Sequence, residues 1–166
     1  MRRILPIPAV LLALLAPAAP SEETVTLKNA KYPDLVRTVR DLQGKVVVVD
    51  FWADFCIPCK KEFPHLVEMQ HKYAAEEFAA VSVSLDDPAD ADARERALKF
   101  LRAQKAEFTN LLLDEPAEVR VDKLKTDSPP FIFVFGRDGR LVKSFVGDEA
   151  NYAQQIEPLV ADLLKK

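Results

Sequence analysis

Hydrophobic positions along the chain alternate between two periods, and this alternation predicts strands and helices in turn. Val46–Val49 form an unbroken β-branched run that leads through Asp50 to two aromatic residues, a pattern typical of a strand buried on both faces. After Cys56 the apolar positions recur every three to four residues, which predicts a helix that continues to Tyr73. The pattern thus places a strand, a short turn and a helix in direct succession.

The rest of the chain continues this alternation. The further predicted strands are 78–85, 111–113, 131–135 and 141–146, and a weaker signal predicts a strand at 25–27. The further predicted helices are 35–42, 93–105, 117–124 and 156–164. Gly44 ends the first helix, and Pro158 either occupies the first turn of the last helix or kinks it. The segment 136–139 joins the last two strands as a hairpin. These elements predict an α/β fold with a central mixed β-sheet flanked by helices.

Composition limits the possible functions. The chain has 166 residues, enough for one ordinary domain, and 49% of them are hydrophobic and 30% charged, as expected for a folded protein. The net charge is −3 and no long basic run occurs, which argues against nucleic acid as a partner. We expect a monomer.

The N-terminus has the pattern of a targeting segment. Arg2 and Arg3 precede an apolar stretch over 4–16, and Ala16 and Ala18 supply small residues at a cleavage site. The stretch is shorter than the roughly 20 apolar residues that span a bilayer, although retention as an anchor stays open. We therefore expect a signal peptide over 1–18, a short tail over 19–24 and a folded domain over 25–166, located outside the cytoplasm. Disulfide bonds form and persist in such a compartment.

The only two cysteines, Cys56 and Cys59, lie at the predicted junction of strand and helix. The helix N-terminus stabilises a thiolate there, so we expect an exposed Cys56 with a lowered pKa to act as the nucleophile. Lys60 and Lys61 are expected to add to the positive field. Cys59, nearly one turn on, would be shielded and would resolve the mixed disulfide, while Pro58 suits the first helical turn. The alternative is a pair of buried structural cysteines, which a Cys-x-x-Cys pair in this position disfavours.

Asp50 lies within the predicted buried strand, six residues before Cys56. Burial of a carboxylate is costly and raises its pKa, so one interpretation is a general base that deprotonates Cys59. The other interpretation is an aspartate at the strand end that local backbone amides satisfy.

Several motifs together resemble the thioredoxin superfamily. The active-site segment of that family is similar to Phe51–Trp52–Ala53, Cys56–Ile57–Pro58–Cys59–Lys60 and Pro64. Asp50 occupies the position of the buried acidic residue of the family. Ser128–Pro129–Pro130–Phe131 resembles its cis-proline loop, with Pro130 as the cis-proline, and Asp138–Gly139 matches the following hairpin. An additional helix and strand between 85 and 114, together with the signal segment, are similar to exported TlpA-like and ResA-like thiol-disulfide oxidoreductases.

This resemblance implies a thioredoxin-like fold over about 25–165 and reduction of disulfides in exported proteins, in some members apocytochrome c during haem attachment. The redox-active disulfide would be the only cofactor, and a membrane thiol donor would return it to the reduced form. The residues implied to contact substrate are Phe55, Ile57, Pro58, Pro129 and Pro130.

Two positions depart from the family pattern. Phe55 stands where the family usually has tryptophan, so the indole donor is lost. Pro129 stands before the cis-proline, where the family normally offers a backbone N–H, so it can accept a hydrogen bond from a substrate but cannot donate one. Both changes concern substrate contacts more than the redox chemistry.

Three other functions are less consistent with the sequence. A peroxidase of the P-x-x-x-T/S-x-x-C type would need a proline and a threonine or serine at the positions that Val49 and Ala53 occupy. A copper(I)-binding chaperone would have only two soft ligands, and a non-enzymatic scaffold would have no need of both cysteines. We expect no metal site at His65 and His71, nor in the acidic segment 86–92, which lacks the pattern of a calcium loop and is expected to be solvated.

Overall fold

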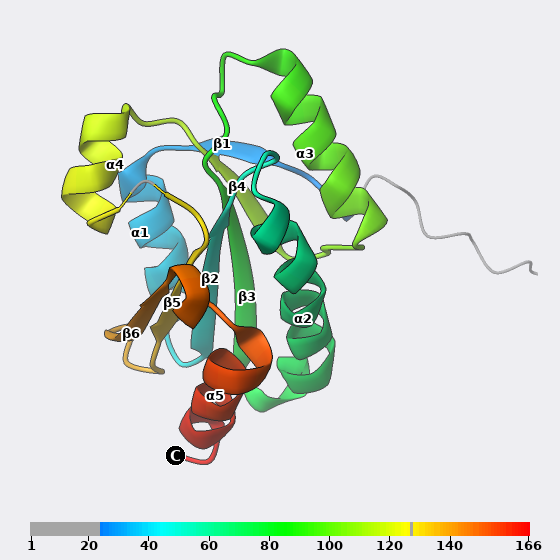
Figure 1. The fold of residues 1–166 in the computed structure, drawn as a ribbon. Coiled ribbons are helices and arrows are strands. Elements are labelled where there is room, and N and C mark those ends of the chain that lie inside the picture. Colours follow the sequence, from blue (N-terminus) through cyan, green and yellow to red (C-terminus); the bar gives the residue numbers. More distant parts are fainter. Residues whose placement is uncertain (1–23, 127) are drawn as a thin grey trace, which may run out of the picture.

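The computed structural model describes residues 24–126 and 128–166 (Figure 1). The predicted signal peptide 1–18 and most of the predicted tail lie outside the described residues. The strands are β1 (Lys28–Ala30), β2 (Val46–Trp52), β3 (Phe78–Ser84), β4 (Thr109–Leu113), β5 (Phe131–Phe135) and β6 (Leu141–Val146). The helices are α1 (Tyr32–Asp41), α2 (Ile57–Tyr73), α3 (Ala91–Ala103), α4 (Ala117–Leu124) and α5 (Glu157–Leu164), with short turns η2 (Ala74–Glu76), η3 (Gly147–Glu149) and η4 (Tyr152–Ile156).

The strands of the described residues form one six-stranded sheet in the order β1-β4-β3-β2-β5-β6. β2 pairs parallel to β3 over its whole length, and β3 and β1 both pair parallel to β4. β5 runs antiparallel to β2, and β6 antiparallel to β5. The mixed sheet is therefore as predicted, and β2, which carries Asp50, lies inside it with hydrogen-bonded neighbours on both sides.

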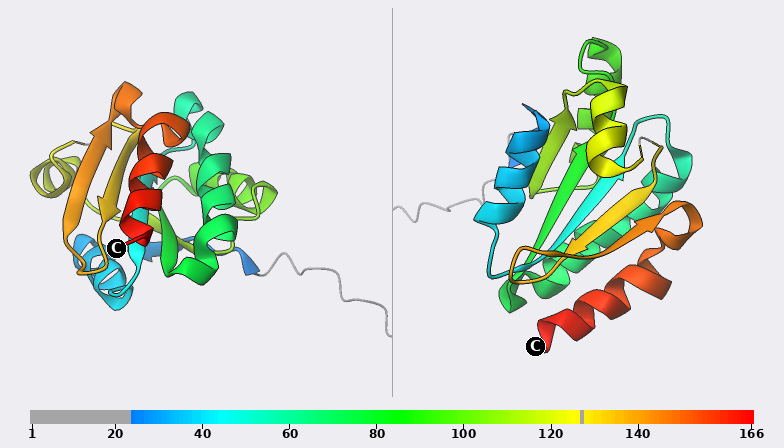
Figure 2. Two further views of the ribbon diagram at one scale, coloured as in Figure 1. Left: turned by 90° about the horizontal axis from the view of Figure 1, so that it is seen from below. Right: turned by 90° about the vertical axis from the view of Figure 1, so that its left-hand side faces the viewer.

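Helices cover both faces of the sheet, which explains why β2 and β3 are buried at every position. α2, α3 and α5 pack on one face, where Trp52, Phe63 and Leu101 belong to the larger apolar core (Figures 1 and 2). α1 and α4 pack on the other face, where Leu35 and Leu124 join a second core. Because side chains alternate along a strand, Asp50 points to the first face and its neighbours in β2 point to the second.

The predicted elements are confirmed, with changes at some ends. The strand signal at 25–27 is displaced, since Val25 and Leu27 are buried but the paired strand is β1, directly after them. The additional helix and strand are α3 and β4, and β4 lies between β3 and β1. Pro158 occupies the first turn of α5, and a π-helical turn, η4, precedes that helix. Within the described residues, no helix combines the length and the apolar character needed to cross a bilayer.

Candidate active site

The two cysteines lie where β2 passes into α2. Cys56 is the N-cap residue of α2, and Pro58 occupies its first turn, where a missing N–H leaves no hydrogen bond unmade. Cys56 and Cys59 form a disulfide with a Cα–Cα distance of 5.3 Å. The backbone N–H of Cys59 donates to Cys56 Sγ at 3.3 Å. The prediction that Cys56 begins the helix is confirmed, and the sulfur lies at the positive end of the helix dipole.

The exposure predicted for Cys56 is wrong in this oxidised form. Cys56 is 5% exposed and Cys59 3%, so the disulfide is almost covered. The side chains beside it are the exposed ones: Phe55 is 74% exposed and Ile57 80%. Exposed apolar side chains that lie close together can form a contact surface for a partner. We call Phe55 and Ile57 the apolar collar of the disulfide.

Asp50 lies buried on the face of the sheet that α2 and α5 cover. The hydroxyl of Tyr152 donates to Asp50 Oδ2 at 2.7 Å. Burial raises the pKa of Asp50 to about 7, although the Tyr152 hydrogen bond opposes part of that rise and the negative charge of Glu62 adds to it. The interpretation of Asp50 as an aspartate satisfied by local backbone amides is not supported, because its hydrogen bond comes from a side chain 102 positions away.

Tyr152 and Glu62 complete the surroundings of Asp50. The backbone N–H of Tyr152 donates to Glu62 Oε2 at 3.3 Å, so Tyr152 contacts both carboxylates. Burial, together with the neighbouring charge of Asp50, raises the pKa of Tyr152 well above its ordinary value, so the phenol stays protonated and remains a donor. Neither residue was predicted from the sequence. Glu62 lies one helical turn after Cys59, a spacing that could have identified it, whereas no local pattern marks Tyr152.

A network of charges fixes the turn before Cys56. The buried Asp86 carboxylate accepts from the backbone N–H of Asp54 at 3.0 Å and from Ser84 Oγ at 2.7 Å. Asp54 in turn pairs with Lys60 at 2.5 Å and Arg96 at 2.6 Å. Burial acts to raise the pKa of Asp54, but the hydrogen bonds from these two cations outweigh it and lower that pKa.

Two predictions are corrected by this network. Asp86 does not belong to a solvated loop, because it is 4% exposed and holds the active-site turn through its hydrogen bonds. The expected contribution of Lys60 to the positive field at Cys56 is reduced, because its ammonium pairs with the Asp54 carboxylate. The helix N-terminus contributes a positive field at the sulfur whatever the state of Lys60.

The proline loop lies beside the start of α2. The Pro129–Pro130 peptide bond is cis, as predicted. The carbonyl oxygen of Pro130 accepts from the N–H of Gly147 at 2.9 Å, which ties the loop to η3. Pro58 and Pro130 line the same depression of about 260 Å³. The other lining residues are Lys61, Glu62, Gly147, Asp148, Ala150 and Asn151.

The two histidines, His65 and His71, lie further along α2 than the cysteines. His65 Nδ1 is 3.4 Å from Glu68, its ring is 6.2 Å from that of Tyr152, and His71 is exposed. Among residues 24–126 and 128–166, no group of three or more histidine, cysteine or acidic side chains is arranged to hold a metal ion.

Comparisons with known proteins agree with this geometry. Residues 20–144 match the model of the AhpC/TSA family. The chain is 28% identical over 126 residues to a thiol-disulfide oxidoreductase ResA of Bacillus cereus, in a match that covers 72% of this chain and 68% of that protein.

Solved structures are similar as well. A Chlorobium tepidum protein described as thiol:disulfide interchange protein DsbE is 32% identical, with a TM-score of 0.62, and the match covers 76% of this chain and 84% of that one. A Bacteroides thetaiotaomicron protein described as a protein disulfide isomerase is 26% identical, with a TM-score of 0.58, and the match covers 77% of this chain and 79% of that one.

Proposed function

Because the chain belongs to the AhpC/TSA family of thioredoxin-like proteins, we propose that it is an exported thiol-disulfide oxidoreductase that reduces disulfides in extracytoplasmic proteins. The observation that carries this proposal is the Cys56–Cys59 disulfide at the N-terminus of α2, with Asp50 buried on the same face of the sheet. The pattern of residues 1–18 supports the exported location.

The reaction transfers two electrons from the reduced cysteine pair to a substrate disulfide. The Cys56 thiolate attacks one substrate sulfur, so a Cys56–substrate disulfide forms and the other substrate sulfur leaves as a thiolate. Cys59 then loses its proton to Asp50 and attacks Cys56 Sγ, which releases the second substrate thiolate and forms the Cys56–Cys59 disulfide. Protonation of the substrate thiolates completes the step. A membrane thiol donor then reduces the pair again.

The chemistry of the site favours reduction over strong oxidation. No histidine lies between the cysteines, so beyond the helix N-terminus no imidazolium stabilises the Cys56 thiolate. A strong oxidant needs a reduced form that is unusually stable. A midpoint potential in the range of thioredoxin-like reductants, measured by equilibration with glutathione, is the expected result.

Recognition of substrate by side-chain fit is supported by two features. The apolar collar offers Phe55 and Ile57 to an apolar segment beside the substrate disulfide. Pro129, which has no N–H, removes one of the backbone hydrogen bonds by which an extended peptide could bind beside the proline loop. We propose oxidised apocytochrome c, whose haem attachment motif is Cys-x-x-Cys-His, as one such substrate.

Trapping of the mixed disulfide tests the redox assignment. Cys59→Ser should accumulate a covalent complex with an oxidised Cys-x-x-Cys-His peptide, and Cys56→Ser should accumulate none. A complex formed through Cys59 instead would contradict the assignment of the nucleophile.

Substrate choice is tested separately. The wild-type protein should reduce the Cys-x-x-Cys-His peptide faster than a matched peptide of scrambled flanking sequence, and both faster than it consumes hydrogen peroxide. Equal rates on the two peptides would remove apocytochrome c as a specific substrate while the redox assignment stands.

A further inference from the structure

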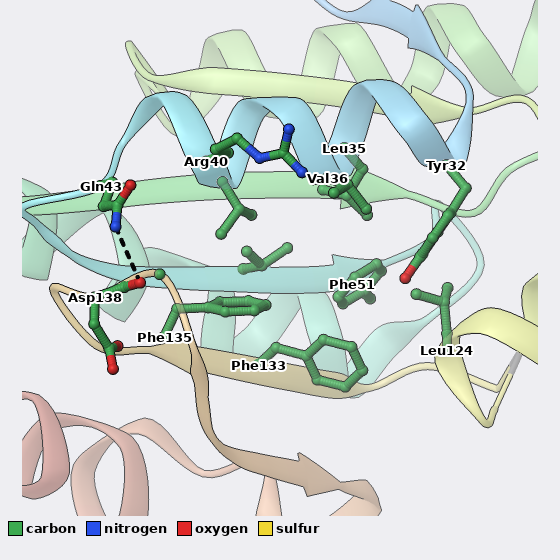
Figure 3. A pocket seen from close by; sticks show the side chains of 13 residues that line it. Tyr32, Leu35, Val36, Arg40, Gln43, Phe51, Leu124, Phe133, Phe135 and Asp138 are labelled. Atoms are coloured by element: carbon green, nitrogen blue, oxygen red, sulfur yellow. Dashed lines mark hydrogen bonds between the residues drawn. The ribbon is translucent and has the colours of Figure 1, made fainter.

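A second cavity lies on the face of the sheet opposite the cysteines. It has a volume of about 400 Å³ and lies between α1, the strands β2 and β5, and the end of α4 (Figure 3). Its volume lies within the range of small-molecule sites.

The walls of this cavity are mainly apolar. Val49 and Phe51 of β2 and Phe133 and Phe135 of β5 line the sheet side, and the α1 side chains stand opposite them in Figure 3. The apolar residues contributed by the helices are Leu35, Val36, Val39 and Leu124. Phe133 and Phe135 are only partly buried, and Val36 is 37% exposed. The cavity is thus open to solvent along an apolar wall.

Polar groups occur at its two ends. Gln43 and Asp138 lie at one end, where Gln43 Nε2 donates to the backbone oxygen of Asp138 at 3.3 Å, and the side chain of Arg40 extends from that side along α1 toward Val36 (Figure 3). Tyr32 lies at the other end, beside Leu124. An elongated apolar cavity with polar ends is suited to a ligand that is itself apolar along its length and polar at one end.

The charged side chains that line the cavity, Arg40 and Asp138, decide which sign of charge the polar group of a ligand should carry. No acidic side chain in the described part of the chain forms an ion pair with Arg40. The carboxylate of Asp138 is already engaged, since its Oδ1 accepts from the N–H of Arg140 at 3.0 Å and its Oδ2 is 3.8 Å from Arg140 Nε. Arg40 therefore presents an unmatched positive charge at the mouth of an apolar cavity.

We propose that this cavity binds an aliphatic monocarboxylate, with the hydrocarbon chain along the wall formed by Phe133 and Phe135 and the carboxylate on Arg40. A guanidinium offers paired N–H donors that match the two oxygens of a carboxylate. The proposal does not depend on the redox function, because the cavity and the cysteines lie on opposite faces of β2.

Binding of octanoate and octan-1-ol to the purified protein tests this proposal. Octanoate should bind saturably at one site, and its amide chemical-shift changes should centre on α1 and β5. Octan-1-ol, which has the same chain without the charge, should bind roughly three- to tenfold more weakly, the range expected for loss of a partly exposed ion pair.

Two variants on α1 form a matched pair. Arg40→Met should weaken octanoate binding to the level of octan-1-ol and leave octan-1-ol binding unchanged. Arg37→Met removes a neighbouring arginine that does not line the cavity and that pairs with Asp34 at 3.2 Å, so both ligands should bind as to wild type. Val36→Glu, which adds a carboxylate to the wall, should weaken both ligands.

Three results would overturn the proposal. The first is the absence of saturable octanoate binding at this face. The second is equal affinity for the two ligands together with no effect of Arg40→Met. The third is concentration-dependent dimerisation through α1 and β5 that excludes octanoate, because a second copy of the chain would then be what covers this face.

Discussion

Removal of the Tyr152 hydroxyl should raise the pKa of Asp50 and shift the pH at which the protein works. The hydroxyl donates to Asp50 Oδ2 at 2.7 Å, and both residues are buried. This hydrogen bond stabilises the ionised carboxylate, so it holds the pKa below the value that burial alone would give. Tyr152→Phe keeps the aromatic ring and removes only the donor.

The size of the effect follows from the free energy of one charged hydrogen bond. Such a bond contributes about 1.5–3 kcal/mol, and about 1.36 kcal/mol changes a pKa by one. The pKa of Asp50 should therefore rise from about 7 to roughly 8–9 in Tyr152→Phe. At pH 7 the ionised fraction falls from about one half to roughly 1–10%, and release of the mixed disulfide slows by about 5- to 50-fold if the carboxylate is the base. The lost rate should return as the pH is raised.

Two measurements check this reasoning. The ionisation of Asp50 can be followed by the pH dependence of its carboxyl carbon resonance, assigned by comparison with Asp50→Asn. The rate of mixed-disulfide release can be followed over the same pH range. Tyr73→Phe is the matched control, since it also removes a hydroxyl from a buried tyrosine, but one that donates to Glu157 at 3.0 Å. An unchanged Asp50 pKa in Tyr152→Phe, or an equal shift in Tyr73→Phe, would refute the argument.

Three further predictions concern other parts of the molecule. Because the folded-state pKa of Asp50 is raised from 3.8 to about 7, its protonation stabilises the fold fully below pH 3.8 and this contribution is lost as the pH rises to about 7. The loss is of the order of 4 kcal/mol at about 1.36 kcal/mol per pH unit, and it should be absent from urea unfolding of Asp50→Asn. Pro129→Thr restores a backbone N–H and should speed reduction of peptide disulfides several-fold while leaving exchange with a small dithiol nearly unchanged; equal acceleration of both would indicate altered cysteine chemistry. Exported protein should begin at or near Ala19 on N-terminal sequencing, and an intact Met1 would reject cleavage.

Sequence patterns predicted most of the fold because the strongest signals are local. The valine run of β2 and the period of α2 are set by burial of neighbouring side chains, and both elements occur where the pattern places them. β1 was harder to predict, since a three-residue strand carries too few alternating positions to fix its register. Val25 and Leu27 gave a strand signal because they are buried, not because they pair.

The candidate site likewise contains residues that are close in sequence, which could be predicted, and contacts between distant segments, which could not. Cys56, Cys59 and Asp50 lie within ten residues of one another, so strand and helix geometry alone could bring them together. Tyr152 reaches Asp50 from the far end of the chain, and only the packing of η4 against α2 makes that contact. The role of Asp86 was missed for a related reason. This residue begins the acidic pair Asp86–Asp87, which suggests solvent, yet its carboxylate turns inward to meet the backbone of the active-site turn.

The surroundings of Asp50 bear on the rates of reduction and oxidation and not on which of the two is favoured. A carboxylate with a pKa of about 7 accepts and returns a proton at nearly equal free energy near neutral pH. Asp50 can therefore assist both attack by Cys59 and the reverse step, in which Cys59 leaves as a thiol. In the proposed role of base, Asp50 would lower the barrier in both directions and would not decide which one is favoured. That decision rests on the relative stability of the reduced and oxidised cysteine pair, where the helix N-terminus favours the Cys56 thiolate. Tyr152→Phe should consequently change the rates of reduction and oxidation together at pH 7, with a much smaller effect on the midpoint potential of the pair.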